Sequence, residues 1–405
     1  MEPTNVMPQI DTKEDVKTKK SSKSWLVFLI VGLLGIFGGV ACFLFILLTP
    51  KEEIAELSFP TIPSKEKSVR YYSNLTGLEV ESEADITAPA YCIQTPNGTD
   101  GGRPQSGLNE AGVIFEAIAE AGITRFAAIY QNPKTAVIGP IRSLRIYYLQ
   151  WDTPFDCTII HAGGAPDALA AVSGGGYKDL TENYAYMYRG TNSARRWNNL
   201  FTTSQNLARF SADSGYTTSN IKGFNRMTPE ESERARIDAN VTQKLVITEP
   251  TVNDTSELAA KVTNININFG GWATFNLNYQ YNPQTNTYDR WYATGDEGSI
   301  YKCTDEDLGE RDPEAVCTLT QMSPAVVVGM VVQEKKQSDN YHEDITTVGS
   351  GDAYIFQNGN VIKGSWMKSS VEEQIKFFNE AGDEVKLAPG QTVIEAVPAY
   401  GSIEY

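Results

Sequence analysis

Residues Val113–Gln131 read VIFEAIAEAGITRFAAIYQ, and the conformation of this stretch sets the fold class of everything around it. It fits either a helix that ends at Gly122 or a β-hairpin that turns at Ala121-Gly122. The part from Ile123 to Tyr130 is strand-like in composition. We therefore predict a hairpin, and with it a region that contains a sheet.

The segments that follow alternate between strand and helix patterns. Residues Cys157–His161, then Gly163-Gly164, then Pro166–Val172 are typical of a strand, a tight turn and a helix. Before them, Gly139-Pro140 leads into Ile141–Gln150, which we predict to be a helix with proline in its first turn. The first region is therefore predicted to be α/β.

The second half of the chain has β alternation instead. Strands are predicted over Asn264–Phe269 and Thr274–Tyr281, and a hairpin over Tyr354–Trp366 with its turn at Asn358-Gly359. A polar stretch from about 229 to 257 separates the two regions. We expect an α/β domain over residues 70–230 and a β-rich domain over residues 258–405.

An apolar run without a charge extends from Trp25 to Leu48. Its 24 residues are enough to cross a hydrocarbon core about 30 Å thick. Lysines precede the run, and basic residues on that side hold it in the cytoplasm. The sequence predicts a cytoplasmic tail (1–24), a single transmembrane helix (25–48), a linker (49–69) and folded domains outside the membrane.

Two other interpretations of this run remain open. Gly39-Val40-Ala41-Cys42 resembles the cleavage site of a lipoprotein, and a cleaved secretory signal also begins with an apolar segment. Phe43–Leu48 continues the apolar run beyond Cys42, which argues against a lipoprotein signal, and a cleaved secretory signal has a shorter apolar core than this one. We therefore favour the retained helix.

The charge of the chain limits its partners. The formal net charge is −16, and the first 24 residues carry slightly more lysine than acid, so the excess lies in the extracytoplasmic part. Such a surface repels nucleic acid and anionic polymers as a whole. No nucleic-acid partner is expected, and an anion site has to be a local basic pocket.

Four of the five cysteines follow the apolar run. Cys303 and Cys317 bracket a polar, acidic stretch with no histidine near it, which favours a disulfide over a metal site. Cys92 and Cys157 lie in short β-like runs and can pair only if their Cα atoms come within about 7 Å. Whether they pair stays open.

Several polar residues are candidates for a site. Arg103 and Ser106 lie in the polar loop RPQSG, and Arg142 and Ser143 fall in the first turn of the helix predicted after Pro140, where backbone N–H groups attract anions. Ordinary alternatives exist for each, because loop arginines also pair with nearby carboxylates and serine commonly starts helices.

A second group of candidates concerns acid and base chemistry. Glu116 and Glu120 are expected to share a face, since four residues make one helical turn and also an even number of strand steps. With Arg125 across the turn they form either a catalytic pair or a salt-bridged surface. His161 ends a predicted strand, where ligands bind in open α/β sheets, although a lone histidine is more often structural.

Taken together, these motifs resemble the YerB-like family, whose members are predicted envelope lipoproteins built from two domains of unknown function. The motifs that carry the resemblance, over roughly residues 85–400, are RPQSGL (103–108), GITRF (122–126), GPIRS (139–143), HAGG (161–164), NLFT (199–202), YNP (281–283), VGSG (348–351) and PGQT (389–392). The resemblance implies an envelope location and two extracytoplasmic domains. This chain departs from the pattern in two places: it has an apolar helix where members carry a lipidated cysteine, and Ile93–Asn97 lacks their usual Asp-Asn-like pair.

The sequence therefore predicts a membrane-anchored envelope protein that binds an anionic cell-wall ligand or an envelope partner without catalysis. Its cleft is expected to be lined by Arg103, Arg125, Arg142 and His161. The alternative is a wall or glycan hydrolase that uses Glu116 and Glu120 with His161. A scaffold that acts through the second domain is a third possibility. No cofactor and no metal are expected.

Overall fold

The computed structural model describes residues 69–237, 262–295, 298–304 and 317–405, which belong to one compact unit. The predicted cytoplasmic tail, the apolar run and all but the last residue of the linker lie outside the described residues. Within the described ranges, no helix is both long enough and apolar enough to cross a bilayer.

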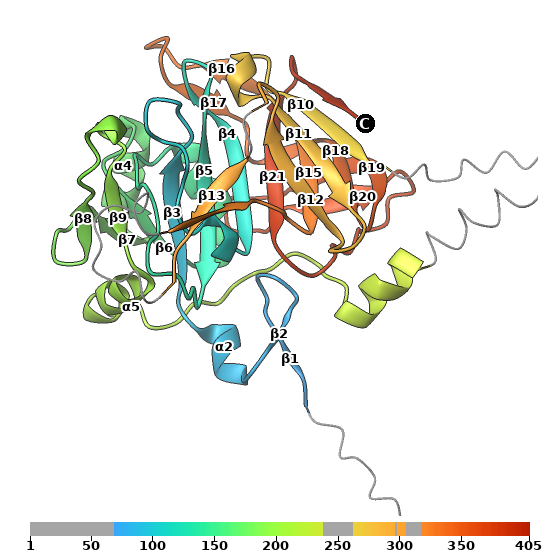
Figure 1. The fold of residues 1–405 in the computed structure, drawn as a ribbon, viewed down its shortest axis with the longest axis horizontal. Helices are drawn as coiled ribbons and strands as arrows, with labels where there is room; N and C mark the ends of the chain where they lie inside the picture. Colours follow the sequence, from blue (N-terminus) through green and yellow to red (C-terminus); the bar gives the residue numbers. More distant parts are fainter. Residues whose placement is uncertain (1–68, 238–261, 296–297, 305–316) are drawn as a thin grey trace, which may run out of the picture. The chain divides into compact units, whose positions relative to one another are not determined.

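A mixed sheet of ten strands runs through this unit (Figure 1). Neighbouring strands are antiparallel except at four pairs, β15–β21, β21–β4, β3–β6 and β6–β7. In spatial order the strands are β20 (Lys376–Asn379), β19 (Asn360–Lys368), β18 (Gly349–Gln357), β15 (Val326–Val332), β21 (Thr392–Pro398), β4 (Val113–Glu120), β5 (Ile123–Gln131), β3 (Ala90–Pro96), β6 (Thr158–His161) and β7 (Lys178–Thr181). The β21–β4 pair thus places strands of the first and second regions in one sheet.

Two hairpins in this sheet confirm their sequence predictions. The β4–β5 turn is formed by Ala121 and Gly122, with φ of 49° and 79°. The β18–β19 turn is formed by Asn358 and Gly359, with φ of 54° and 74°. Two-residue turns with both φ values positive match the right-handed twist of the strands they connect, which is why glycine and asparagine signal them in a sequence.

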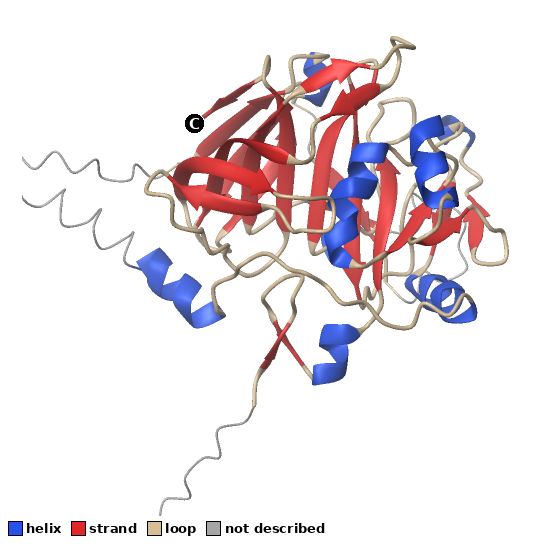
Figure 2. Ribbon diagram, turned by 180° about the vertical axis from the view of Figure 1, so that it is seen from behind, coloured by secondary structure: helices blue, strands red, loops and turns tan. Residues whose placement is uncertain are grey.

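One face of the sheet is covered by two helices, α3 (Ile146–Asp152) and α4 (Pro166–Ser173), as Figure 2 shows. Tyr147, Tyr148 and Trp151 of α3 are buried against Phe115 and its neighbours in the largest apolar cluster. The rings of Phe115 and Trp151 stack with their centroids 5.3 Å apart. We call this the helix face of the main sheet.

The opposite face carries a second sheet, which lies in front of β15, β18 and β21 in Figure 1. Its strands are β12 (Thr287–Tyr292), β11 (Leu277–Asn282), β10 (Asn264–Asn268) and β22 (Ser402–Glu404). Tyr279 and Tyr288 pack there against Val327 and Phe356. Over β3 and β6 the same face is covered by α5 (Ser204–Asp213). We call this the sheet-covered face.

Smaller elements surround this framework. They are β1 (Tyr71–Tyr72), β2 (Glu79–Val80), α2 (Glu83–Thr87), β8 (Met187–Arg189), β9 (Leu200–Thr202), β13 (Ser299–Lys302), β14 (Thr318–Gln321), β16 (Glu334–Lys336), β17 (Glu343–Ile345) and the short 3-10 turn η4 (Ala273–Phe275). Helical and strand segments alternate in the first region, and strands dominate the second. The predicted α/β character of the first region and the β-rich character of the second are therefore confirmed.

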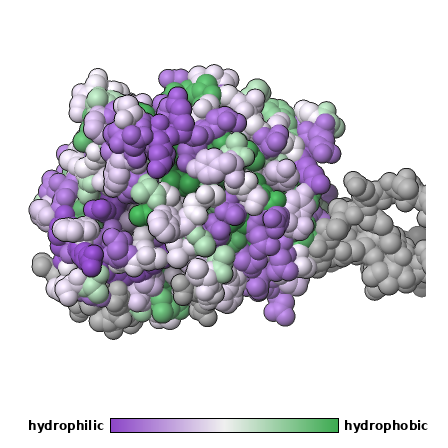
Figure 3. All heavy atoms as spheres, turned by 90° about the horizontal axis from the view of Figure 1, so that it is seen from above, coloured by the Kyte–Doolittle hydropathy of each residue, from purple (hydrophilic) through white to green (hydrophobic). Residues whose placement is uncertain are grey.

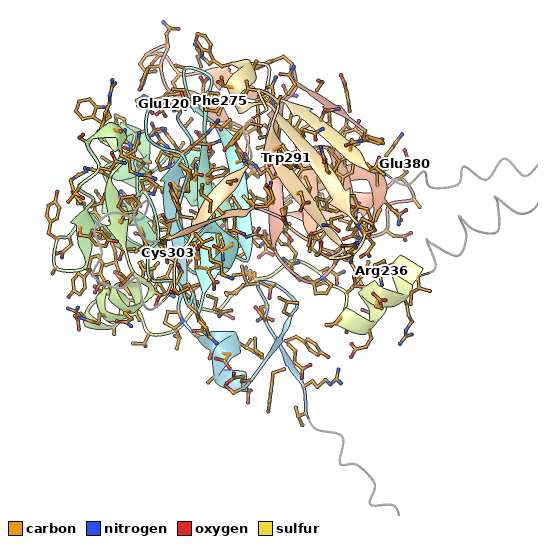
Figure 4. The ribbon with its side chains drawn as sticks, in the orientation of Figure 1. Glu120, Arg236, Phe275, Trp291, Cys303 and Glu380 are labelled. Carbon is orange, nitrogen blue, oxygen red and sulfur yellow. A yellow bond between two sulfur atoms is a disulfide. The ribbon has the colours of Figure 1, made fainter. Side chains whose placement is uncertain are left out.

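Two disulfides are present. Cys303 and Cys317 are joined, as predicted, with Cα atoms 4.7 Å apart; Cys303 is labelled in Figure 4. Cys92 and Cys157 are joined as well, with Cα atoms 5.7 Å apart. The second bond follows from topology, because β3 and β6 are parallel neighbours and Cys157 directly precedes β6.

The helix predicted for Ile141–Gln150 is wrong in its first half, since α3 begins only at Ile146. Residues 141–144 are extended because their backbones bond to other segments. The N–H groups of Ile141, Arg142 and Leu144 donate to the carbonyl oxygens of Leu200, Gln94 and Gly163, at 2.7, 2.8 and 3.0 Å. Arg142 and Ser143 therefore do not lie in the first turn of a helix.

Candidate functional site

Glu116 and Glu120 point to opposite faces of the main sheet. Ile118 pairs with Thr124 whereas Glu120 pairs with Ile123, so β4 contains one more residue than β5 across this step. An extra residue of this kind, a β-bulge, reverses the side-chain alternation beyond it. The expectation that the two carboxylates share a face is therefore wrong.

On the helix face, Glu120 is held between two arginines. One carboxylate oxygen accepts from Arg125 Nη2 at 2.7 Å and the other from Arg145 Nη2 at 2.5 Å. Burial alone would raise the pKa of Glu120, but the guanidinium charges of Arg125 and Arg145 outweigh it and hold the pKa below its ordinary value. Glu120 is therefore ionised and compensates part of this positive charge.

Arg142 adds a third guanidinium close to Glu120, because its charge also lowers the pKa of that carboxyl. The main chain of Arg142 is anchored, with its N–H on Gln94 and its carbonyl oxygen accepting from Ala162 N–H at 3.0 Å. Its side chain is half-buried, and no hydrogen bond or ion pair joins its guanidinium to another described residue. Glu120, Arg125, Arg142 and Arg145 form what we call the arginine cluster, which has an excess of two positive charges.

Ser143 contributes to the same place through its main chain. Its carbonyl oxygen accepts from Arg125 Nη1 at 2.7 Å, and its hydroxyl donates to the carbonyl oxygen of Ala162 at 3.2 Å. The structure thus brings together the predicted residues Arg125, Arg142 and Ser143. Arg145, which the sequence analysis missed, lies three residues after Arg142 and was absorbed into the predicted helix.

His161 ends β6, as expected, but its imidazole is enclosed. Nδ1 lies 2.6 Å from the carbonyl oxygen of Gly163, and Nε2 lies 2.8 Å from Asp179 Oδ1. The side chain is almost completely buried. Both ring nitrogens are therefore engaged by other groups of the protein.

Arg103 and Ser106 are not brought to the arginine cluster. Arg103 belongs to the sheet-covered face, where Nε donates to the Asn97 carbonyl oxygen at 2.8 Å and the guanidinium lies 3.5 Å from the centroid of the Tyr292 ring. Ser106 is buried, and its backbone pairs with Gly139 at 2.7 and 3.1 Å. Of the four residues predicted to line one cleft, only Arg125 and Arg142 lie close to Glu120.

Glu116 belongs to a second polar centre, which is sealed between the two sheets. Its Oε2 accepts from Arg290 Nη2 at 2.6 Å, and its Oε1 accepts from Asn97 Nδ2 at 2.8 Å and Thr124 Oγ1 at 2.6 Å. Glu395 pairs directly opposite Glu116 across β21 and β4. We call Glu116, Arg290, Glu395 and their bonded partners the sealed centre.

One of the two carboxyl groups of the sealed centre is held neutral. Burial raises the pKa of Glu395 well above its ordinary value, and the neighbouring Glu116 carboxylate raises it further. A neutral Glu395 leaves one carboxylate facing one guanidinium. Tyr279 Oη donates to Glu395 Oε1 at 2.5 Å, which ties the second sheet to the first. Because Glu116 and Glu395 are fully buried, we assign the sealed centre to structure rather than to ligand contact.

The fold defines a disulfide-containing protein in which an α/β region and a β-rich region share one sheet. Residues 75–217 match the family model described as protein of unknown function (DUF3048), N-terminal domain, and residues 265–394 match its C-terminal domain. The chain belongs to this two-domain, YerB-like family.

Two comparisons with Bacillus subtilis YerB agree with this assignment. The protein named "Putative lipoprotein YerB" of strain 168 is 25% identical over 362 residues, which cover 88% of this chain and 93% of that protein. The crystal structure of YerB from the same species matches with a TM-score of 0.63 and 22% identity, over 83% of this chain and all of the other. The second comparison supports the fold.

Proposed function

We propose that the protein is an extracytoplasmic component of the bacterial cell envelope that binds an anionic group, without catalysis, at the arginine cluster. The observation that carries this proposal is Arg142, a half-buried guanidinium with no ion pair to a described residue in a chain of formal charge −16. Phosphate and carboxylate groups fit the planar donor fork of arginine.

Two features support the envelope location. Disulfides persist in oxidising compartments outside the cytoplasm, and this chain has two. The related YerB protein is named a lipoprotein, and the apolar run at 25–48 offers either a transmembrane anchor or a lipid attachment at Cys42. We favour the transmembrane anchor, and mass spectrometry of the mature protein distinguishes the two, because a chain that begins at a diacylated Cys42 would contradict it.

The geometry of the two carboxylates does not favour the rival function, a hydrolase that uses Glu116 and Glu120. The two carboxylates lie on opposite faces of the main sheet, and Glu116 is sealed. A general acid and base have to reach the same substrate bond. A binding protein is therefore the better-supported proposal.

The test is calorimetric titration of the full-length protein with inorganic phosphate at low and moderate salt. Arg142→Ala is expected to weaken binding about 10- to 100-fold, since a charge-assisted hydrogen bond contributes about 1.5–3 kcal/mol. Arg234→Ala, which removes an exposed arginine from the helical segment 229–237, is the matched control and should bind as the wild type does. Equal affinity of both variants for phosphate would contradict the proposal and favour the interpretation of the protein as a scaffold.

A further inference from the structure

A separate cavity of about 380 Å³ opens beside the β4–β5 turn. Three other segments line it: the loop 270–272, the β16–β17 hairpin, and Tyr400 just before β22. This is the end of the unit at which Figure 1 labels β16 and β17 and at which Figure 4 labels Glu120 and Phe275. Figure 3 looks onto this end and shows hydrophobic residues set among hydrophilic ones.

Two aromatic side chains stand at this cavity. Trp272 is 66% exposed and Tyr400 is 60% exposed. Trp272 Nε1 donates to the carbonyl oxygen of Ala121 at 2.8 Å, which holds the indole in place. Glycines bring the rings close, because a Cβ at Gly122 would lie 2.9 Å from Trp272 Cδ1 and one at Gly270 would lie 2.4 Å from Tyr400 Cδ2.

Two carboxylates face the same cavity. Glu343 pairs with Lys336 and Ile345 with Glu334 across the β16–β17 hairpin, so Glu334 and Glu343 lie on one side of it. Glu343 is only 3% exposed, yet no hydrogen bond or ion pair joins its carboxylate to another described residue. Glu334 accepts from Tyr400 Oη at 2.7 Å through Oε1, while its buried Oε2 has no partner.

The pKa values of both carboxyls are raised. Burial, and then the charge of Glu343, raises the pKa of Glu334 to about 7, against the lowering effects of Tyr400 and Lys336. Burial also raises the pKa of Glu343, and Asp339 and Glu120 raise it further while Lys336 and His342 lower it. Ionised carboxylates only accept hydrogen bonds. Above the pKa of Glu334, where both carboxyls are ionised, the group that complements them is a positively charged donor.

We propose that this cavity is a binding site for a primary ammonium group carried on an aliphatic stem. The ammonium donates to Glu343 and to Glu334 Oε2, and the stem packs on the exposed indole of Trp272 and on Ile118. Aromatic rings favour cations near their faces, and paired carboxylates lose their mutual repulsion when a cation enters. The site uses other residues than the arginine cluster and the opposite charge, while the charge of Glu120 acts on both Glu343 and the three arginines.

The test is titration of the full-length protein with pentylamine, with pentanol and methyl glucoside as neutral probes. Of the three probes, only pentylamine is expected to bind. It should bind about tenfold more tightly at pH 8 than at pH 5.5, since Glu334 ionises between these values. Binding of pentanol to the same extent would show an unspecific apolar site. Binding of methyl glucoside instead would show a site for hydroxyl groups, and either result overturns the proposal.

Variants sharpen this test. Glu343→Gln should weaken pentylamine binding about tenfold or more, and Trp272→Ala about fivefold. Lys336→Gln, on an exposed side chain, should tighten binding about two- to threefold by removing a positive charge, and it remains informative if Glu343→Gln fails to fold. Trp197→Ala is the matched control, because Trp197 is also 66% exposed and lies elsewhere in the chain. Unchanged affinity in both Lys336→Gln and Trp272→Ala would contradict the proposal.

Discussion

Glu116 and Glu120 lie four residues apart on β4, yet they belong to centres of opposite kinds. In the sealed centre, Glu116 forms a one-to-one ion pair with the buried guanidinium of Arg290, and the raised pKa of Glu395 keeps that carboxyl neutral. In the arginine cluster, one carboxylate faces three guanidinium groups. The ratio of carboxylates to guanidinium groups, rather than the presence of an acid and an arginine, thus distinguishes a structural ion pair from a candidate binding site.

The bulge in β4 produces this difference. Without the extra residue between Ile118 and Glu120, both carboxylates would face the second sheet. With it, Glu120 turns to the helix face and meets Arg145 at the start of α3. A local irregularity of one residue therefore places the two carboxylates on opposite faces of the main sheet.

The largest expected effect is the loss of the buried ion pair. Arg290→Ala leaves Glu116 as an uncompensated buried charge and should reduce the free energy of unfolding by about 3–5 kcal/mol. Arg142→Ala removes a half-buried side chain without an ion pair and should cost less than about 0.5 kcal/mol. Urea denaturation of both variants measures the two values, and similar losses would erase the distinction between the centres.

A smaller effect depends on pH. The pKa of Glu395 is raised in the folded protein, so its contribution to stability is full below the unfolded value of about 4.3 and is lost as pH rises toward the folded value. Glu395→Gln keeps a neutral side chain at every pH. The variant should therefore gain on the wild type by up to about 1.4 kcal/mol per pH unit within that window.

The control for this measurement is Glu404→Gln, which changes an exposed glutamate of β22. Its urea midpoint should follow that of the wild type from pH 5 to pH 8. A difference between Glu395→Gln and the wild type that stays constant over this range would mean that Glu395 is ionised in the folded protein.

The smallest effect concerns the affinity of the arginine cluster. Glu120→Gln removes the one negative charge that faces the three arginines, so phosphate binding should tighten about threefold at low salt and less at high salt. Calorimetry with phosphate measures this change. Weaker binding in the variant would indicate that Glu120 is needed to hold the arginines in place rather than to oppose the ligand.

The sequence predicts the local features of this fold and misses those that depend on distant partners. The turns at Ala121-Gly122 and Asn358-Gly359 can be predicted from the sequence because both residues of such turns need positive φ. The conformation of residues 141–144 cannot be predicted in this way, since it rests on hydrogen bonds to Gln94, Gly163 and Leu200. A proline after glycine favoured a helix start, and only the tertiary pairing decides against it.

The same reason explains what was predicted of the site. Arg125, Arg142 and Ser143 do meet, although the helix start that suggested Arg142 and Ser143 is absent. The pairing of Glu395 with Glu116 joins strands that are far apart in the sequence, and no local sequence pattern predicts it. The bulge likewise has no clear signal, because Ala119 and its neighbours fit a regular strand equally well.

The most direct test of the account follows the arginine Nε–Hε signals by ¹⁵N-edited NMR while the full-length protein is titrated with inorganic phosphate. Signals assigned by single Arg→Lys variants separate the two centres. We predict that the Arg142 signal shifts in a saturable, salt-sensitive manner while the Arg290 signal stays in place. A shift at Arg290 without one at Arg142, or no saturable shift at either, would contradict the claim that the arginine cluster is the anion site.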